Sequence, residues 1–132
     1  MRYDYAAMGF YTFDCLGWPV TAIPPNGDTY FIRDLTLAVS GAAGTAVIAG
    51  AKLGLDCLAI GGYGRDMMGD WAVARIASFG IDISALQRFD DTPTSSSIVL
   101  TRPDGSRPAL HLKGATGRFE IDPADFDRVT DA

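Results

Sequence analysis

This chain of 132 residues is poor in the side chains that build metal and redox sites. It contains one histidine and two cysteines, Cys15 and Cys57, which lack the paired spacing of a zinc site. Thiols in a reducing compartment usually behave as small apolar residues. We therefore expect both cysteines in buried or pocket-lining strands, with neither a disulfide nor a metal ion.

Positive charge and long apolar runs are also scarce. Eleven Lys and Arg residues are scattered among sixteen Asp and Glu, which gives a formal net charge of -5. Nucleic-acid surfaces need clustered basic residues, so we expect no nucleic-acid partner. No apolar run could span a bilayer, and Asp4 stands where a signal peptide would begin its apolar segment. We expect a cytoplasmic protein with no membrane partner.

Two common phosphate-binding motifs are missing. A P-loop requires Gly-x-x-x-x-Gly-Lys followed by Ser or Thr, which no glycine turn of this chain provides. Gly62, Gly64 and Gly69 have the wrong spacing for the dinucleotide fingerprint Gly-x-Gly-x-x-Gly. The sequence therefore indicates neither a Walker-type ATP site nor an NAD site.

Glycine, in contrast, is abundant. The chain has 15 glycines, many of them within residues 40–54 and 61–69. Glycine turns let the backbone approach a ligand closely, and a helix that starts at such a turn presents unpaired N–H groups. We expect a small, polar, oxygen-rich ligand at these turns.

Hydrophobic spacing predicts strands alternating with helices along much of the chain. Strands are expected at 3–10 and 57–60, helices at 45–53 and 67–79, and a short edge strand at 87–89 after a turn containing Asp82 and Ser84. The uninterrupted apolar run at 57–60 is typical of a strand buried on both faces of a parallel sheet.

Two hairpins are expected outside this pattern. A turn at 24–28 joins β-rich flanks at 18–23 and 29–39, and a turn at 103–106 joins 94–101 to 107–113. No predicted helix covers either hairpin. We therefore expect the two hairpins to share a separate small sheet.

A last helix is predicted to start at Asp122–Pro123 and to bury Phe126 and Val129. A helix that follows a strand usually leads to another parallel strand, and the sequence ends at Ala132 before one could follow. We therefore expect the sequence to be the front part of a longer protein.

Several motifs, in their order and spacing, resemble the N-terminal part of the ribokinase-like, or PfkB-type, carbohydrate kinases. They are the step from Gly9 to Asp14 and residues 41–45, 51–54, 64–69, 79–82 and 103–105. The resemblance implies an α/β fold with a mostly parallel sheet flanked by helices, and a small antiparallel β lid. It places the core at about residues 1–14, 40–90 and 114–132, and the lid at about 15–39 and 91–113. It also implies phosphorylation of a sugar or nucleoside hydroxyl by ATP.

The resemblance also implies a substrate site. Asp14 matches the carboxylate that accepts hydrogen bonds from substrate hydroxyls, and Gly41 matches a glycine of the paired-glycine turn beneath the substrate. Other positions expected to contact the substrate are Ala42 and Thr45 beside that turn, and Ser95, Ser97 and Val99 in the lid.

The chain departs from the family pattern at two positions of this site. Thr45 and Ser40 stand where the family usually has an asparagine and a second glycine. A hydroxyl cannot replace all the donors and acceptors of a carboxamide. The substrate's identity is therefore not carried over.

A larger departure concerns the catalytic groups. The family's catalytic aspartate, its Gly-Ala-Gly-Asp anion hole and most of its nucleotide pocket lie in a C-terminal part without a counterpart here. The resemblance thus implies a catalytic aspartate beyond Ala132 and no catalytic residue within this chain. We expect the full-length protein to use ATP and Mg²⁺, and this chain alone to bind neither and to be inactive.

The residues also allow other interpretations. Asp14 could be a turn carboxylate, and the turn at 41–45 could serve only close packing. Asp66 is expected to cap a helix rather than touch a ligand, Arg65 to be solvated, and His111 to have no catalytic role. The alternative function is a non-catalytic module that binds a sugar or forms a homodimer through the exposed edge of the lid.

Overall fold

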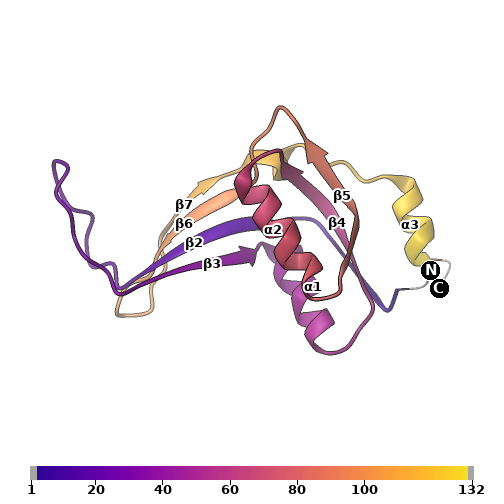
Figure 1. The fold of residues 1–132 in the computed structure, drawn as a ribbon, viewed down its shortest axis with the longest axis horizontal. Coiled ribbons are helices and arrows are strands. Elements are labelled where there is room, and N and C mark those ends of the chain that lie inside the picture. The colour runs from indigo at the N-terminus through magenta and orange to yellow at the C-terminus, as the bar shows by residue number, and fades with distance from the viewer. Residues whose placement is uncertain (1–2, 131–132) are drawn as a thin grey trace.

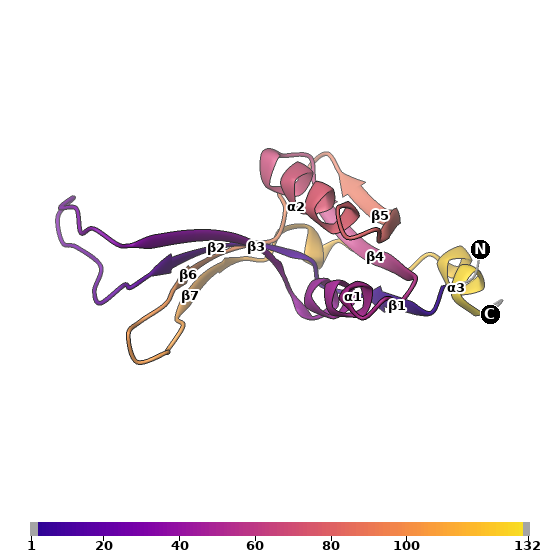
Figure 2. The same cartoon turned by 60° about the horizontal axis from the view of Figure 1, so that its bottom comes forward.

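The computed structural model describes residues 3–130, which form two β-sheets with helices packed around one of them (Figure 1). The first sheet is parallel and has the order β1-β4-β5, with β1 at Tyr5–Met8, β4 at Cys57–Gly64 and β5 at Asp82–Phe89. The second sheet has four strands in the order β3-β2-β6-β7 and projects away from the helices, as Figure 2 shows.

The three-stranded sheet is covered on both faces. Helices α1 (Ala42–Lys52) and α2 (Met67–Ala77) pack on the face that carries Cys57 and Ala59. Leu58 and Ile60 point to the other face, which is covered in part by Phe119 and by Val129 of helix α3 (Pro123–Thr130). Both side chains are 0% exposed, which confirms the prediction of a strand buried on both faces.

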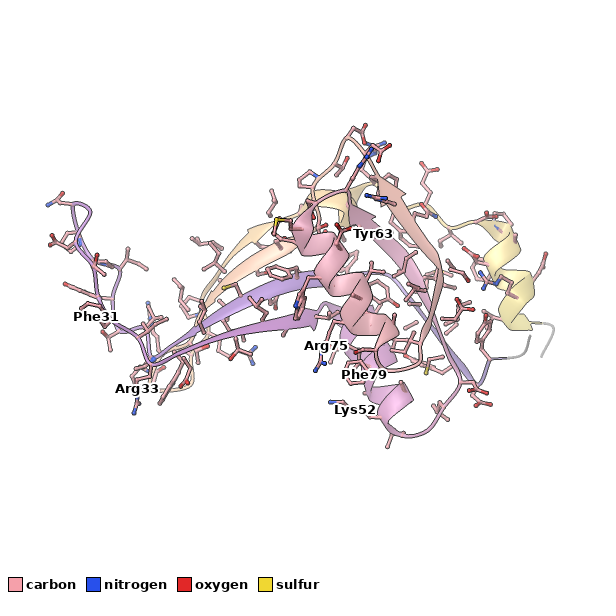
Figure 3. The ribbon with its side chains drawn as sticks, viewed as in Figure 1. Phe31, Arg33, Lys52, Tyr63, Arg75 and Phe79 are labelled. Carbon is pink, nitrogen blue, oxygen red and sulfur yellow. The ribbon has the colours of Figure 1, made fainter. Side chains whose placement is uncertain are left out.

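The two covering helices also meet beside the sheet. Figure 3 shows Lys52, at the end of α1, and Arg75, near the end of α2, on either side of Phe79. The Lys52 Nζ lies 5.4 Å from the centre of the Phe79 ring, and the Arg75 guanidinium carbon lies 4.8 Å from it. Cation–aromatic contacts of this kind add to the packing that joins the helices.

The four-stranded sheet consists of two hairpins. Strands β2 (Thr12–Trp18) and β3 (Asp34–Ser40) pair antiparallel, as do β6 (Ser96–Leu100) and β7 (Ala109–Leu112). A parallel contact between β2 and β6 joins the hairpins. This confirms that both hairpins belong to one separate sheet.

The arms of the first hairpin are not where the sequence placed them. The prediction of a first arm at 18–23 was wrong, because that strand is Thr12–Trp18, and the second arm, predicted at 29–39, is the later and shorter strand Asp34–Ser40. Residues 19–33 form a projecting loop whose Phe31 is 94% exposed (Figure 3). Proline lacks the N–H that a strand donates, and the three prolines of this loop cannot extend the ladder. Asp14 therefore lies within a strand and not in a turn.

Two other boundaries differ from prediction. Helix α1 begins three residues earlier than expected, directly after Gly41, whose φ of 82° suits a sharp turn. Strand β5 begins at Asp82, where a turn was expected. Asp82 still makes the local hydrogen bond that is typical of a turn, because its Oδ1 accepts the Ser84 N–H over 2.8 Å. The register between β4 and β5 shifts near this point.

The last helix starts at Pro123, as predicted, but Phe126 is not buried. It is 46% exposed, because α3 instead turns Asp125, Arg128 and Val129 toward the sheet. Arg128 donates to Ser84 Oγ over 2.6 Å and pairs with Asp82 over 3.4 Å. These polar contacts decide which face of the helix is covered.

The cysteines are free thiols, Cys57 buried in β4 and Cys15 half-buried in β2. Burial raises the pKa of the Cys57 thiol, and nearby Asp4 and Asp56 add to this effect. Among residues 3–130, no helix combines the length and the apolar character needed to cross a lipid bilayer.

Candidate functional site

Asp14 occupies the middle of the four-stranded sheet. It lies in β2, in register with Ala38 of β3 on one side and Ser97 of β6 on the other. The residue is only 8% exposed, and its buried Oδ1 accepts no hydrogen bond from any residue that the structure describes. A buried carboxylate oxygen without a donor is costly, so this atom is suited to accept a hydrogen bond from a ligand.

The turn at Gly41 borders the same face of the sheet. Thr12 and Asp14 are two residues apart in β2 and therefore point to the same side. A Cβ at Gly41 would lie 3.0 Å from Thr12 Oγ1 and would collide with the carbonyl of Phe10. Glycine is thus required here, both by this contact and by its positive φ. The structure brings the Gly41 turn to the face on which Asp14 lies.

Two further residues that were predicted to contact the substrate lie in helix α1 and are accessible to solvent. Ala42 and Thr45 are exposed in the first turn of α1, directly after Gly41. Gly41 supplies no side-chain cap, and the Gly44 N–H donates to the carbonyl of Phe10 over 3.1 Å. The only polar group of the Thr45 side chain is its hydroxyl.

The three lid positions differ in accessibility. Ser97 is half-buried beside Asp14, whereas Val99 is only 5% exposed and Ser95 is 0% exposed. Ser95 Oγ accepts the Thr116 N–H over 2.9 Å and donates to the carbonyl of Lys113. In this conformation Ser95 ties the two arms of the second hairpin at their base. Of the three, Ser97 is the one positioned to reach a ligand beside Asp14.

His111, for which the sequence predicted no catalytic role, lies next to Ser97. It pairs with Ser97 across β6 and β7, and its Nδ1 lies 2.9 Å from Ser97 Oγ. Side chains alternate along strands, so register places Asp14, Ser97 and His111 in one row on one face. The sequence alone could not reveal this row, because it depends on how three separate strands pair.

Asp66 connects the two sheets rather than contacting the site. As predicted, it caps α2, and its Oδ1 accepts the Gly69 N–H over 2.8 Å. The same carboxylate also accepts the Thr94 N–H over 2.8 Å and the Thr94 hydroxyl over 2.7 Å, just before β6 begins. Burial opposes ionisation of Asp66, but the hydrogen bonds from Thr94 and Gly69 outweigh it and lower the pKa of the carboxyl.

The main hollow of the four-stranded sheet does not lie between Asp14 and Gly41. Its volume is about 490 Å³, and its wall includes Phe13 and Cys15, whose side chains point to the opposite face of β2 from Asp14. The complete wall consists of Phe13, Cys15, Met68, Ser96, Ser97, Ile98, Leu110, His111 and Leu112. The hollow is mainly apolar and differs from the polar cradle that the motifs suggested.

Two common types of ligand site are lacking among the described residues. Within residues 3–130, no three His, Cys, Asp or Glu side chains lie together as metal ligands. The glycine turns at 41–45 and 61–69 also lack the lysine of a P-loop.

The catalytic aspartate was expected beyond Ala132. Ala132 itself lies outside the residues that the structure describes, which end at Thr130. The position of that aspartate therefore stays a prediction from the family resemblance. Asp14 and the Gly41 turn are the main elements of the candidate site among the residues that the structure describes.

Comparisons with known proteins show which fold this is. No protein-family model matches the chain. A deoxyribokinase from Salmonella typhi is 23% identical over 128 residues, which are 97% of this chain and 41% of that protein. The chain thus spans about two fifths of the length of this curated relative.

Two solved structures extend the likeness. A ribokinase from Arabidopsis thaliana, complexed with ribose and ATP, matches all of this chain and 44% of its own with a TM-score of 0.83 and 19% identity. A putative ribokinase II from E. coli matches 95% of this chain and 40% of its own, with a TM-score of 0.80 and 22% identity. The ribokinase-like fold predicted from the motifs is thereby confirmed.

Proposed function

We propose that this chain, whose fold is ribokinase-like, supplies the sugar-binding part of an ATP-dependent carbohydrate kinase. The observation that carries the proposal is the buried Asp14 Oδ1, which has no donor among the described residues and lies on the face bordered by the Gly41 turn. An ionised carboxylate only accepts hydrogen bonds, and hydroxyl groups donate them. A polyhydroxylated ligand therefore fits this atom.

The ligands bound to two structurally similar proteins support a sugar-kinase reaction. The Arabidopsis ribokinase is complexed with ribose and ATP, and a ribokinase from Cryptococcus neoformans is in complex with ADP. By this likeness the complete protein phosphorylates a sugar or a related hydroxyl compound and takes the phosphoryl group from ATP, with Mg²⁺ as the accompanying ion. The residues that bind ATP and Mg²⁺ would lie outside this chain.

The role of this chain in the reaction is to bind and orient the sugar that accepts the phosphoryl group. Asp14 holds hydroxyl groups, Gly41 lets the backbone approach them, and Ala42, Thr45 and Ser97 border the same region. Ser95 and Val99 would support the sheet from within. Phosphoryl transfer depends largely on positioning, so a site that fixes one hydroxyl contributes directly to the rate. The projecting sheet would act as a lid that excludes water.

Ribose binding to the 132-residue chain tests this proposal. In nuclear magnetic resonance titrations, ribose should shift the amide signals of residues 12–14, 41–42 and 97. Asp14→Ala should weaken this binding at least about tenfold, because a hydrogen bond to a charged group contributes about 1.5–3 kcal/mol. Asp34→Asn, an exposed aspartate at the start of β3, is the matched control and should change nothing.

Two results would overturn the proposal: no ribose-dependent shifts, or binding that Asp14→Ala leaves intact. The reaction itself is tested on the longest form of the protein that the gene encodes, by ATP consumption against a panel of sugars. Consumption that no sugar stimulates would contradict a kinase role even if ribose binds.

A second candidate, a homodimer formed through the lid, is favoured by an apolar face. Leu37, Cys15, Ile98 and Leu110 are register partners that run across all four strands, opposite to Asp14. Ile98 is 54% exposed and Leu110 is 66% exposed. A second copy carries the same face and can cover it symmetrically. Sedimentation should then show a dimer that Leu110→Asp dissociates, and a monomeric wild-type chain would exclude this role.

A further inference from the structure

The projecting loop carries the only asparagine of the chain. Residues 19–33 extend beyond the ends of β2 and β3, at the left of Figure 1, and Asn26 lies with Gly27 in the tight turn of this loop. Both residues are exposed. Asn26 has φ of 51°, and no other residue except glycine has a positive φ within residues 3–130. The turn thus combines exposure with a backbone conformation that few side chains adopt.

A single hydrogen bond holds this turn. Between residues 21 and 32 the structure describes one hydrogen bond, from the Asp28 N–H to the carbonyl of Pro25 over 2.9 Å. A Cβ placed on Gly27 would meet no atom within 4 Å, so no other described segment packs against the turn at this point. Exposed loops with so few contacts open locally at little cost in free energy. The peptide that joins Asn26 to Gly27 is therefore free to rotate out of the turn.

An asparagine followed by glycine can react with its own backbone. Once the turn opens, the backbone nitrogen of Gly27 can approach Cγ of the Asn26 side chain, and a bond between them closes a five-membered ring. Gly27 has no Cβ to shield this nitrogen or to restrict the rotation. Its N–H also donates no hydrogen bond that the structure describes. The nitrogen is thus available as a nucleophile.

We propose that Asn26 and Gly27 form a site of spontaneous modification, at which Asn26 is converted to aspartate and isoaspartate through a cyclic imide. The new bond between the Gly27 nitrogen and Cγ replaces the bond between Cγ and the side-chain nitrogen, which leaves as ammonia with the proton of the Gly27 N–H. Water then opens the ring at either carbonyl carbon. The inference does not depend on the proposed function.

Either product changes the loop. Both carry a new carboxylate near Asp28, so the tip of the loop gains a negative charge. In isoaspartate the main chain runs through the side chain and is one carbon longer, so the hydrogen bond from Asp28 to Pro25 cannot keep its geometry. The converted loop therefore differs in both charge and shape.

The turn of the second hairpin provides a contrast within the chain. Gly105 also has a positive φ and open space around it, but it follows an aspartate. An ionised carboxylate is a poorer electrophile than an amide. The Gly105 N–H donates to the carbonyl of Arg102 over 3.0 Å, and Asp104 Oδ1 accepts the Ser106 N–H over 2.8 Å. We expect no modification at Asp104 in the time that converts Asn26.

Mass spectrometry tests the proposal on the folded 132-residue chain. After incubation in mildly alkaline buffer, which favours attack by the deprotonated nitrogen, the tryptic peptide that ends at Arg33 should be heavier by the difference between a hydroxyl and an amino group. Chromatography should separate it into an aspartate and an isoaspartate form. The peptide that contains Asp104 should keep a single form. A chain unfolded in urea should convert no more than about tenfold faster, because the turn opens at little cost.

Two variants identify the attacking atom. Gly27→Ala should slow the conversion at least about tenfold, because the Cβ shields the nitrogen and restricts the backbone. Gly105→Ala is the matched control and should leave the rate at Asn26 unchanged. Equal rates in Gly27→Ala and the wild type would overturn the proposal, because water would then hydrolyse the amide directly. Conversion in the urea-unfolded chain alone would also overturn it, because the folded turn would then protect Asn26.

Discussion

The two sheets of this chain are stabilised in different ways. The three-stranded parallel sheet has side chains buried on both faces, and Leu58, Ala59 and Ile60 of its central strand are all 0% exposed. The four-stranded sheet projects from the helices (Figure 2) and leaves large apolar side chains such as Ile98 and Leu110 about half exposed or more. The first sheet forms the core, whereas the second depends on its junction with that core and keeps one apolar face largely exposed.

The difference explains why the candidate site lies where the sheets meet. A fully packed sheet has no room for a ligand, and an isolated sheet cannot hold one rigidly. Asp14 belongs to the projecting sheet, while Gly41 connects that sheet to helix α1 of the core. The site thus combines Asp14 of the projecting sheet with a turn that is anchored to the core.

The largest effect is expected from shortening a core side chain. Ile60→Ala should lower the free energy of unfolding by about 3 kcal/mol, because it leaves a cavity at a fully buried position. Ile98→Ala, the same change on the projecting sheet, should cost less than about 1 kcal/mol because its side chain is 54% exposed. Urea unfolding measures both values. Equal losses would mean that the apolar face of the second sheet is covered in solution.

The two sheets meet where Gly64, at the end of β4, contacts residues 92–94 before β6. A substitution at this junction should lower the free energy of unfolding nearly as much as one in the core. A Cβ at Gly64 would collide with the backbone of Thr92 and Thr94, so Gly64→Ala should cost about 2–3 kcal/mol. Gly105→Ala is the control, since that glycine has φ of 84° but open space around it, and should cost about 1 kcal/mol. A Gly64→Ala variant as stable as Gly105→Ala would show that the junction yields easily.

Removing the Asp66 carboxylate should loosen the projecting sheet more than the core. Asp66→Ala loses a helix cap and both hydrogen bonds to Thr94, at an expected cost of about 2 kcal/mol. Amide hydrogen exchange should accelerate in β6 and β7 more than in β4. The control is Asp122→Ala, which removes the Asp122 bond to the Ala124 N–H, far from the junction. Uniform acceleration in all strands would contradict a local role.

Protonation of Asp66 at acid pH should remove part of the stability that its carboxylate provides. The pKa of Asp66 is lowered in the folded chain from an ordinary 3.8, so its contribution is complete above that value and disappears as pH falls through the lower folded pKa. Asp66→Asn should therefore lose less stability than the wild type between neutral pH and about pH 2. The urea midpoint across this range measures the difference, and parallel curves would exclude Asp66 as a source.

The sequence predicted most elements of the core but not the details of the projecting sheet. The apolar run at Cys57–Ile60 reflects a local rule and was located correctly. The same holds for Gly54 and Gly80, which follow the ends of α1 and α2. The arms of the first hairpin were misplaced, because Asp14 and Gly17 interrupt the apolar alternation of β2 and obscure the strand. Phe126 was wrongly expected to be buried, because polar contacts of Arg128 orient α3.

Asp14 was singled out as a candidate carboxylate only by the resemblance of the motifs to a known family. Local physical rules, in contrast, were enough to determine this protein's α/β fold class, its glycine turns and the helix cap at Asp66. Each of these depends on residues close together in the chain, where backbone sterics and side-chain periodicity act. Only the tertiary structure decided that Ser97 and His111 lie beside Asp14 and that Thr94 is bound to Asp66. These pairs join segments distant in sequence, and their register follows from the packing of the whole chain.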